Sequence, residues 1–193
     1  MTALTACDTD FPPLPTEGFS IPPRWEGEHI MLVSAAPQWV EMDFAAVIAS
    51  RKKLKHLFGP TDSWPPEGLD ITANYADLAW HEKEFQARRS FAYHLLNHEA
   101  NQCLGCLYIY PTASRDHDAE AYLWSHIELD TPLANLIESE VIDWVIHEWP
   151  FFKIAWPGRF IPFSVWVKAE VPNYYACCRD MGTSPLSLGI NHT

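Results

Sequence analysis

Residues 119–144, AEAYLWSHIELDTPLANLIESEVIDW, decide the fold. The first ten residues contain alternating aromatic and polar side chains, a pattern typical of a strand. After a short acidic elbow, Thr131 is a good helix N-cap, Pro132 suits the first turn, and apolar residues then recur at helical spacing. A strand that passes through an elbow into an amphipathic helix predicts an α/β domain.

The segments on both sides of this stretch extend the prediction. Residues 90–98 and 102–111 have the composition of strands, and the breaks between them and residues 119–128 are short, which predicts an antiparallel meander. A further strand is expected at 152–159, after the helix, and should run parallel to its neighbour. A strand at 29–35, a helix at 37–58 and a helix at 73–89 with Thr72 as its cap precede the meander. After the last strand, residues 162–182 predict a partial helix broken near Pro172, and residues 183–193 form a polar end. The expected fold is therefore α/β, with a mixed, mostly antiparallel sheet flanked by helices.

The N-terminal residues differ in composition from the rest of the chain. Residues 1–28 include five of the 16 prolines and show no sustained hydrophobic period. We expect them to form an extended arm that lies on a single domain of residues 29–193, since 193 residues fit one ordinary domain. The acidic, proline-containing start does not resemble a secretory signal, so a cytoplasmic location is expected.

The composition also limits the partners. The formal net charge is −12, which repels phosphate backbones and anionic lipid headgroups, so neither nucleic acid nor a membrane is expected as a partner. The 5 cysteines are irregularly spaced, and no two-pair zinc motif occurs. Cys103 and Cys106 should face opposite sides of a regular strand, so no metal site is expected. No nucleotide-binding loop or hydrolase motif is present.

The order of elements, with HIMLVSA at 29–35, LGCLYIYP at 104–111, AEAYLWSHIE at 119–128 and TPLANLIESEVIDWVIHEW at 131–149, resembles the GNAT superfamily of N-acetyltransferases. The branch that acetylates ribosomal proteins and small amines is the most similar. The resemblance covers about residues 28–182. It implies an acyl-CoA-dependent N-acyltransferase that uses acetyl-CoA as co-substrate and transfers the acyl group directly to an amine in a ternary complex. The acceptor would be a small-molecule amine, a peptide N-terminus or a lysine.

In this superfamily, the strand before the elbow separates from the next strand and binds pantetheine, and the following helix offers its first amides to the pyrophosphate. The resemblance thus implies a cofactor site formed by Trp124, Ser125, Ile127, Leu129, Thr131, Leu133, Ala134 and Asn173.

The elbow departs from the family pattern because it contains no glycine. Two carboxylates, Glu128 and Asp130, stand there instead, and Pro132 removes one N–H donor. A carboxylate beside pyrophosphate opposes binding by about 1 to 4 kcal/mol. Two alternatives follow: an enzyme that binds CoA weakly, or a catalytically silent domain that serves binding or dimerisation. An enzyme of this fold that has abandoned CoA is a further alternative.

Amine acetylation needs a base for the ammonium proton and an acid for the leaving thiolate. Glu120 and His126 are candidate bases on the strand before the elbow. In the superfamily a tyrosine of the last helix is the acid; no tyrosine stands at its usual position here, and Tyr175, or its neighbour Tyr174, could substitute for it. Trp64, Trp80, His81 and Tyr108 are the expected lining of the acceptor site. The many aromatic residues leave open whether some pack against a second copy in a homodimer.

Overall fold

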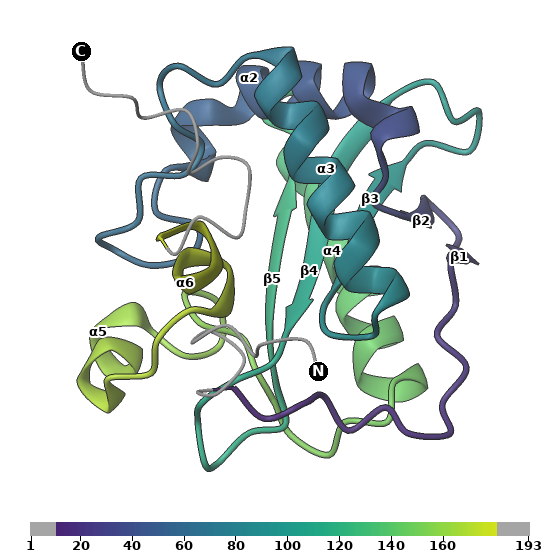
Figure 1. Cartoon of the computed structure of the whole chain (residues 1–193). Coiled ribbons are helices and arrows are strands. Elements are labelled where there is room, and N and C mark those ends of the chain that lie inside the picture. The colour runs from purple at the N-terminus through teal and green to yellow at the C-terminus, as the bar shows by residue number, and fades with distance from the viewer. Residues whose placement is uncertain (1–10, 181–193) are drawn as a thin grey trace.

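The computed structural model describes residues 11–180 as a six-stranded sheet with helices on both faces (Figure 1). The strands are neighbours in chain order: β1 (Arg24–Glu26), β2 (Met31–Ser34), β3 (Phe91–Leu96), β4 (Cys103–Tyr110), β5 (Ala119–Ser125) and β6 (Ile154–Ala155). All neighbouring pairs from β1 to β5 are antiparallel, and β5 pairs with β6 in parallel. The predicted mixed, mostly antiparallel α/β fold is confirmed.

The helices form one layer on each face of the sheet (Figure 1). A 3₁₀ turn, η1 (Pro37–Trp39), leads into α2 (Val40–Leu54), and α3 (Ile71–Gln86) follows. These helices and α6 (Tyr174–Asp180) contribute to the core on one face, whereas α4 (Thr131–Glu148) contributes to the core on the other. The predicted partial helix near residue 163 is α5 (Phe163–Trp166), followed by η2 (Val167–Ala169).

Aspartates rather than threonines cap the two longest helices. Asp70 precedes α3 and its Oδ1 accepts the Ala73 N–H at 2.7 Å, so the expected cap at Thr72 is wrong. Asp130 precedes α4 and accepts the Leu133 N–H at 2.9 Å, so the expected cap at Thr131 is also wrong. In both cases the aspartate has extended backbone, which aims its short carboxylate at the third amide of the helix.

A β-bulge changes the phase of β4. Leu95 pairs with Gly105, but Leu96 pairs with Cys103, so Leu104 is an extra residue. Cys103 and Cys106 consequently lie in the same core cluster, whereas Leu104 and Leu107 lie in the cluster on the other face. The expectation that the two cysteines face opposite sides is wrong, because strict alternation fails across the bulge.

The segment expected to be an extended arm is attached to the domain, and its end forms strand β1. Phe11 and Leu14 are buried, and Arg88 donates through Nη2 to the carbonyl oxygens of Thr16 and Phe19 at 2.6 and 2.9 Å. Between residues 11 and 180, no helix is long and apolar enough to cross a bilayer. The predicted polar end at 183–193 lies outside the described residues.

Candidate functional site

The first element of the candidate site is a separation between β5 and β6. The two strands pair only at Ala119 with Ile154 and at Glu120 with Ala155. Past this point the chain of β6 enters a tight turn in which the Trp156 carbonyl oxygen accepts the N–H groups of Arg159, Phe160 and Ile161. A cavity of about 460 Å³ lies where the strands separate, bounded by residues 121–123 on one side and 157–159 on the other.

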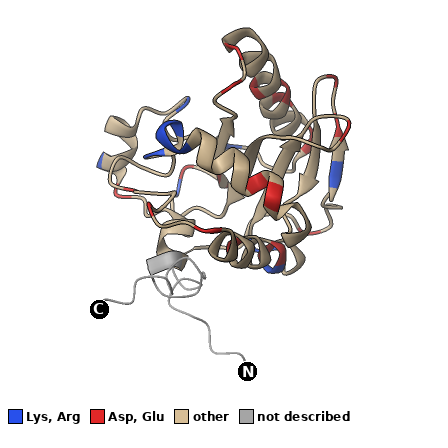
Figure 2. Ribbon diagram, turned by 90° about the horizontal axis from the view of Figure 1, so that it is seen from above, with Lys and Arg blue, Asp and Glu red and all other residues tan. Residues whose placement is uncertain are grey.

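Basic side chains line this cavity. Lys53, Lys55 and His56 reach it from the C-terminal end of α2, and Arg159 reaches it from the turn after β6. On the rest of the described chain, acidic residues are spread over helices and loops while Lys and Arg occupy a few separate places (Figure 2). A cavity with several cations in a chain of net charge −12 is suited to an anionic ligand.

Side chains contact the unpaired edge of β5. Arg159 donates through Nη2 to the Leu123 carbonyl oxygen at 3.2 Å and through Nη1 to Glu138 at 2.9 Å. Lys53 Nζ donates to the backbone and hydroxyl oxygens of Ser125 at 2.7 and 2.8 Å, and the Ser125 hydroxyl donates to Glu138 at 2.6 Å. We call Lys53, Ser125, Glu138 and Arg159 the edge network. Glu138 is its single carboxylate between two cations, so the network retains net positive charge.

Desolvation lowers the pKa of the Lys53 ammonium group. The positive charge of Arg159 lowers it further, whereas Glu138 opposes both effects. An anion bound beside Lys53 would act in the same direction as Glu138, because its negative charge favours the charged ammonium group.

The N-terminus of α4 has few amides left for an anion. The Leu133 N–H bonds the Asp130 carboxylate, the Ala134 N–H bonds the Asp130 carbonyl oxygen, and Pro132 has no N–H. Thr131 is the one residue of the first turn whose N–H has no partner among the described residues. The position at which the helix would hold a phosphate is thus occupied by the protein's own carboxylate.

Glu120 does not line this cavity but bonds a residue that does. Its side chain is fully buried and accepts hydrogen bonds from the Thr112 and Tyr122 hydroxyls, both at 2.7 Å. Burial raises the pKa of Glu120 to about 7, although interactions with Tyr122, Thr112 and the Asn173 side chain partly oppose the shift. Tyr122 lines the cavity and so connects it to Glu120. A carboxyl group with a pKa near 7 is well matched to proton transfer at neutral pH.

The other two predicted catalytic residues lie elsewhere. The Tyr175 hydroxyl is buried and donates to Asp77 of α3 at 2.8 Å. His126 is buried just after β5, where its Nδ1 accepts the Glu128 N–H at 3.1 Å. Neither residue lines the cavity between β5 and β6.

The structure places four of the eight predicted cofactor residues at the edge of β5 or the start of α4, and the other four in the core or in local hydrogen bonds. Ser125 belongs to the edge network, and Thr131, Leu133 and Ala134 form the first turn of α4. Trp124 is buried, with its indole N–H directed at the Tyr108 hydroxyl at 3.4 Å. The remaining three have local roles: the Ile127 N–H bonds Ser50, the Leu129 N–H bonds the His126 carbonyl oxygen, and the Asn173 side chain caps the Ala176 N–H.

The structure brings the predicted substrate residues together, but inside the core. Trp64, Trp80, His81 and Tyr108 are all buried, with rings in successive contact: Trp80 with His81 at 4.9 Å and His81 with Tyr108 at 5.7 Å between centroids. Three of them, Trp64, His81 and Tyr108, line a small cavity of about 10 Å³ that also borders Asp43, His94 and Cys106. Asp43, His94 and Cys106 are the group that could hold a metal ion in the described part of the chain.

Sequence reasoning missed the basic lining of the cavity. Lys53, Lys55 and His56 lie at the C-terminal end of α2. Basic residues are common there because they favour the helix dipole, so their presence did not indicate a ligand. Arg159 follows Gly158 in a turn, and only the divergence of the strands shows that it faces Leu123.

Comparison with solved structures identifies the fold. A crystal structure titled as a probable acetyltransferase superposes with a TM-score of 0.50 at 14% sequence identity, covering 69% of this chain and 72% of that one. The chain shares the fold of this acetyltransferase structure. Two other solved structures align over similar lengths: a ribosomal-protein-S5-alanine acetyltransferase from Vibrio fischeri (TM-score 0.49, 12% identity, 76% and 80% coverage); and an acetyltransferase from Salmonella typhimurium that modifies the N-terminal serine of ribosomal protein L7/L12 (TM-score 0.47, 11% identity, 64% and 67% coverage). The sequence matches no protein-family model and no curated protein.

Proposed function

We propose that the chain is an acyl-CoA-dependent N-acyltransferase that transfers an acetyl group from acetyl-CoA to a primary amine. The observation that supports this best is the separation of β5 from β6 after two paired residues, with a cavity of about 460 Å³ lined by cations where the strands part. An unpaired strand edge offers amide and carbonyl groups to a pantetheine arm, and the cations offer charge to phosphates.

In this proposal the edge network opens when CoA binds. Arg159 leaves the Leu123 carbonyl oxygen and Lys53 leaves Ser125, which frees both carbonyl groups for pantetheine amides. The released guanidinium and ammonium groups then bind the phosphates. The two cations exchange hydrogen bonds within the protein for charge-assisted bonds to the phosphates, so neither side chain is left without a partner when CoA binds.

Glu120 acts as the base. The ammonium proton of the acceptor passes to the Tyr122 oxygen while the Tyr122 hydroxyl proton moves to Glu120, the group to which it is already hydrogen-bonded. The neutral amine attacks the thioester carbon, the C–N bond forms and the C–S bond breaks. The second proton lost by the nitrogen goes to the departing CoA thiolate. The proton on Glu120 returns to water.

Calorimetric titration with CoA tests the proposal. We expect saturable binding of one CoA per chain, weakened about tenfold in Lys53→Met and in Arg159→Met, which corresponds to about 1.4 kcal/mol. Arg115→Met is the matched control, since Arg115 is exposed in the loop before β5 and does not line the cavity. No heat at millimolar CoA, or equal affinities in all variants, would contradict the proposal.

A silent GNAT-fold domain is the second candidate, and two observations favour it. Asp130 fills the anion position at α4, and the edge network closes the β5 edge. On this alternative, CoA does not bind to the wild type, and removal of the Asp130 carboxylate does not create binding either. The same titration, repeated on Asp130→Ala, therefore separates the two functions.

A further inference from the structure

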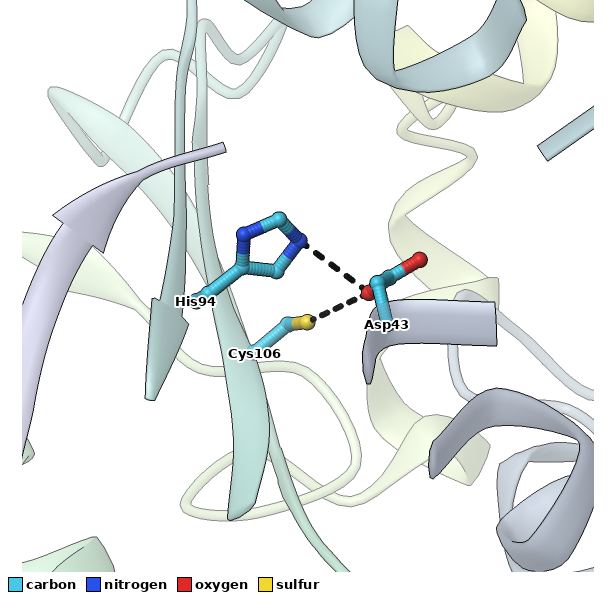
Figure 3. A group of neighbouring side chains, drawn as sticks. All are labelled: Asp43, His94 and Cys106. Atoms are coloured by element: carbon cyan, nitrogen blue, oxygen red, sulfur yellow. Dashed lines mark hydrogen bonds and ion pairs between the residues drawn. The ribbon is translucent and has the colours of Figure 1, made fainter. Parts of the chain in front are cut away.

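A second group of chemically active side chains lies in the core, on the face covered by α2 and α3. Asp43 points from α2 toward His94 on β3 and Cys106 on β4 (Figure 3). His94 and Cys106 are direct cross-strand partners, so the sheet fixes their separation. All three are buried, and their ligand atoms lie within 4.8 Å of one another.

We propose that Asp43, His94 and Cys106 bind a divalent transition-metal ion, with Zn²⁺ as the cation that their chemistry favours. The three donors are a carboxylate oxygen, an imidazole nitrogen and a thiolate sulfur, the set that Zn²⁺ takes in tetrahedral sites. They come from one helix and two strands. A bound ion would therefore fasten α2 to the centre of the sheet.

The observed distances suit a tetrahedral ion. His94 Nε2 lies 3.1 Å from Asp43 Oδ1, and Cys106 Sγ lies 3.5 Å from the same oxygen. Metal–ligand bonds of about 2.0 to 2.3 Å at tetrahedral angles place such atoms roughly 3.3 Å and 3.6 Å apart. These two pairs of donors therefore need to move by only a few tenths of an ångström, and the third pair, His94 with Cys106, lies within 4.8 Å.

The imidazole of His94 is only partly satisfied. Its Nδ1 has no hydrogen-bond partner within residues 11–178, although the side chain is 1% exposed, and its Nε2 forms an ion pair with Asp43 Oδ1 at 3.1 Å. A metal ion between Nε2 and Oδ1 would bond both atoms in place of that ion pair. Asn74 already orients the carboxylate, because its Nδ2 donates to Asp43 Oδ2 at 2.7 Å and leaves Oδ1 toward the other two donors.

Cys103 is the candidate for a fourth ligand. The bulge at Leu104 turns it to the same face as Cys106. Its thiol donates to the Gly105 carbonyl oxygen at 3.4 Å, so the side chain has to leave this contact to reach an ion held by the other three residues. The adjoining cavity, at about 10 Å³, has room for about one water molecule or ion.

Refolding with a spectroscopic metal tests the site. The full chain is unfolded with a chelator present, then refolded with and without Co²⁺, which reports thiolate ligation by intense absorption bands. We expect one Co²⁺ per chain with thiolate bands, displacement by Zn²⁺, and a higher melting temperature with either metal. Cys106→Ser should abolish the thiolate bands or weaken Co²⁺ affinity at least tenfold, whereas Cys177→Ser, a change in α6, should leave them unchanged.

The wild type alone keeps the test decisive if Cys106→Ser does not fold. No Co²⁺ uptake and no change in melting temperature with Zn²⁺ would overturn the proposal and leave Asp43 and His94 as a buried ion pair. Equal Co²⁺ spectra in wild type and Cys106→Ser would overturn it too. Cys103→Ser then tests the fourth ligand: a shift of the bands without loss of the metal assigns Cys103 to the ion.

Discussion

Glu120 illustrates how a single residue links stability to the proposed chemistry. Its carboxyl group on β5 is fully buried and accepts hydrogen bonds from two hydroxyl groups, and it takes part in no ion pair within the described part of the chain. Burial without a countercharge favours the protonated form, so the group holds its proton to a pH at which an ordinary glutamate has lost it. Two measurable consequences follow from this residue.

The first consequence concerns the free energy of unfolding. The pKa of Glu120 is about 7 in the folded state against 4.5 for an ordinary glutamate, so its protonated form stabilises the fold fully below about pH 4.5. This contribution, about 3 kcal/mol, is lost as pH rises through 7. We expect Glu120→Gln, which keeps an uncharged acceptor, to remove this loss. Urea unfolding from pH 4.5 to 8 measures it, and parallel curves for wild type and variant would contradict the assignment.

The second consequence concerns catalysis. If deprotonated Glu120 is the base, kcat/KM for amine acetylation should rise with pH and level off above an inflection near 7. Glu120→Gln should lose the inflection and about 100-fold to 10,000-fold of kcat/KM, with CoA affinity unchanged. Steady-state kinetics from pH 5.5 to 9 checks this, with Tyr175→Phe as a comparison because its hydroxyl bonds Asp77 outside the cavity. A retained inflection in the glutamine variant would move the base to another group.

At the scale of elements, α4 has a cap that serves stability at the expense of anion binding. Asp130→Ala should lower the free energy of unfolding by about 0.5 to 2 kcal/mol, because the Leu133 N–H loses its acceptor. The same change frees that amide and removes a negative charge, so CoA should bind about tenfold or more tightly. Chemical denaturation of this variant measures the loss of stability, and calorimetric titration measures the gain in CoA affinity.

Asp70→Ala is the matched control for Asp130→Ala. Asp70 caps α3 by the same contact, a carboxylate oxygen that accepts the third amide of the helix. It should cause a similar loss of stability and leave CoA affinity as in the wild type. If both variants change CoA affinity equally, the effect comes from loosening of the fold and not from the α4 amide.

Strand β4 depends on a glycine at its bulge. Gly105 has φ +150°, a conformation that side chains rarely adopt, and an added Cβ would collide with the Trp124 carbonyl oxygen on β5. Gly105→Ala should therefore lower the free energy of unfolding by about 2 kcal/mol or more. Gly68→Ala provides the comparison, since nothing lies within 4 Å of its added Cβ. Chemical denaturation of both variants should show a large loss for Gly105 only.

At the scale of the whole molecule, the N-terminal segment is an integral part of the structure. Arg88 holds residues 16 and 19 through two carbonyl bonds, and β1 extends the sheet. Arg88→Ala should speed hydrogen exchange of the amides between residues 14 and 26 and leave β3 and β4 protected. Mass-spectrometric exchange measures this, with Arg115→Ala as control. Uniform acceleration throughout the chain would mean global destabilisation instead.

The sequence predicted the fold better than the site, for a physical reason. The strands from 90 to 125 and the helix from 131 follow from local patterns of period two and 3.6, which need no knowledge of distant residues. Asp130 and Thr131 are both residue types that cap helices well, so the sequence could not tell which of the two keeps the extended backbone of a cap. The contacts of Lys53 with Ser125 and of His94 with Asp43 join residues 72 and 51 positions apart, and only the folded chain brings them together.

The extra residue in β4 has a consequence for how chains of this kind should be compared. Successive residues of a strand point to opposite faces of the sheet, so one extra residue reverses the face of the residues before it relative to those after it. A related chain could keep both cysteines three positions apart and still place them on opposite faces of the sheet, if its strand ran without the bulge. The bulge at Leu104, rather than the cysteines themselves, is then the trait to trace across genomes.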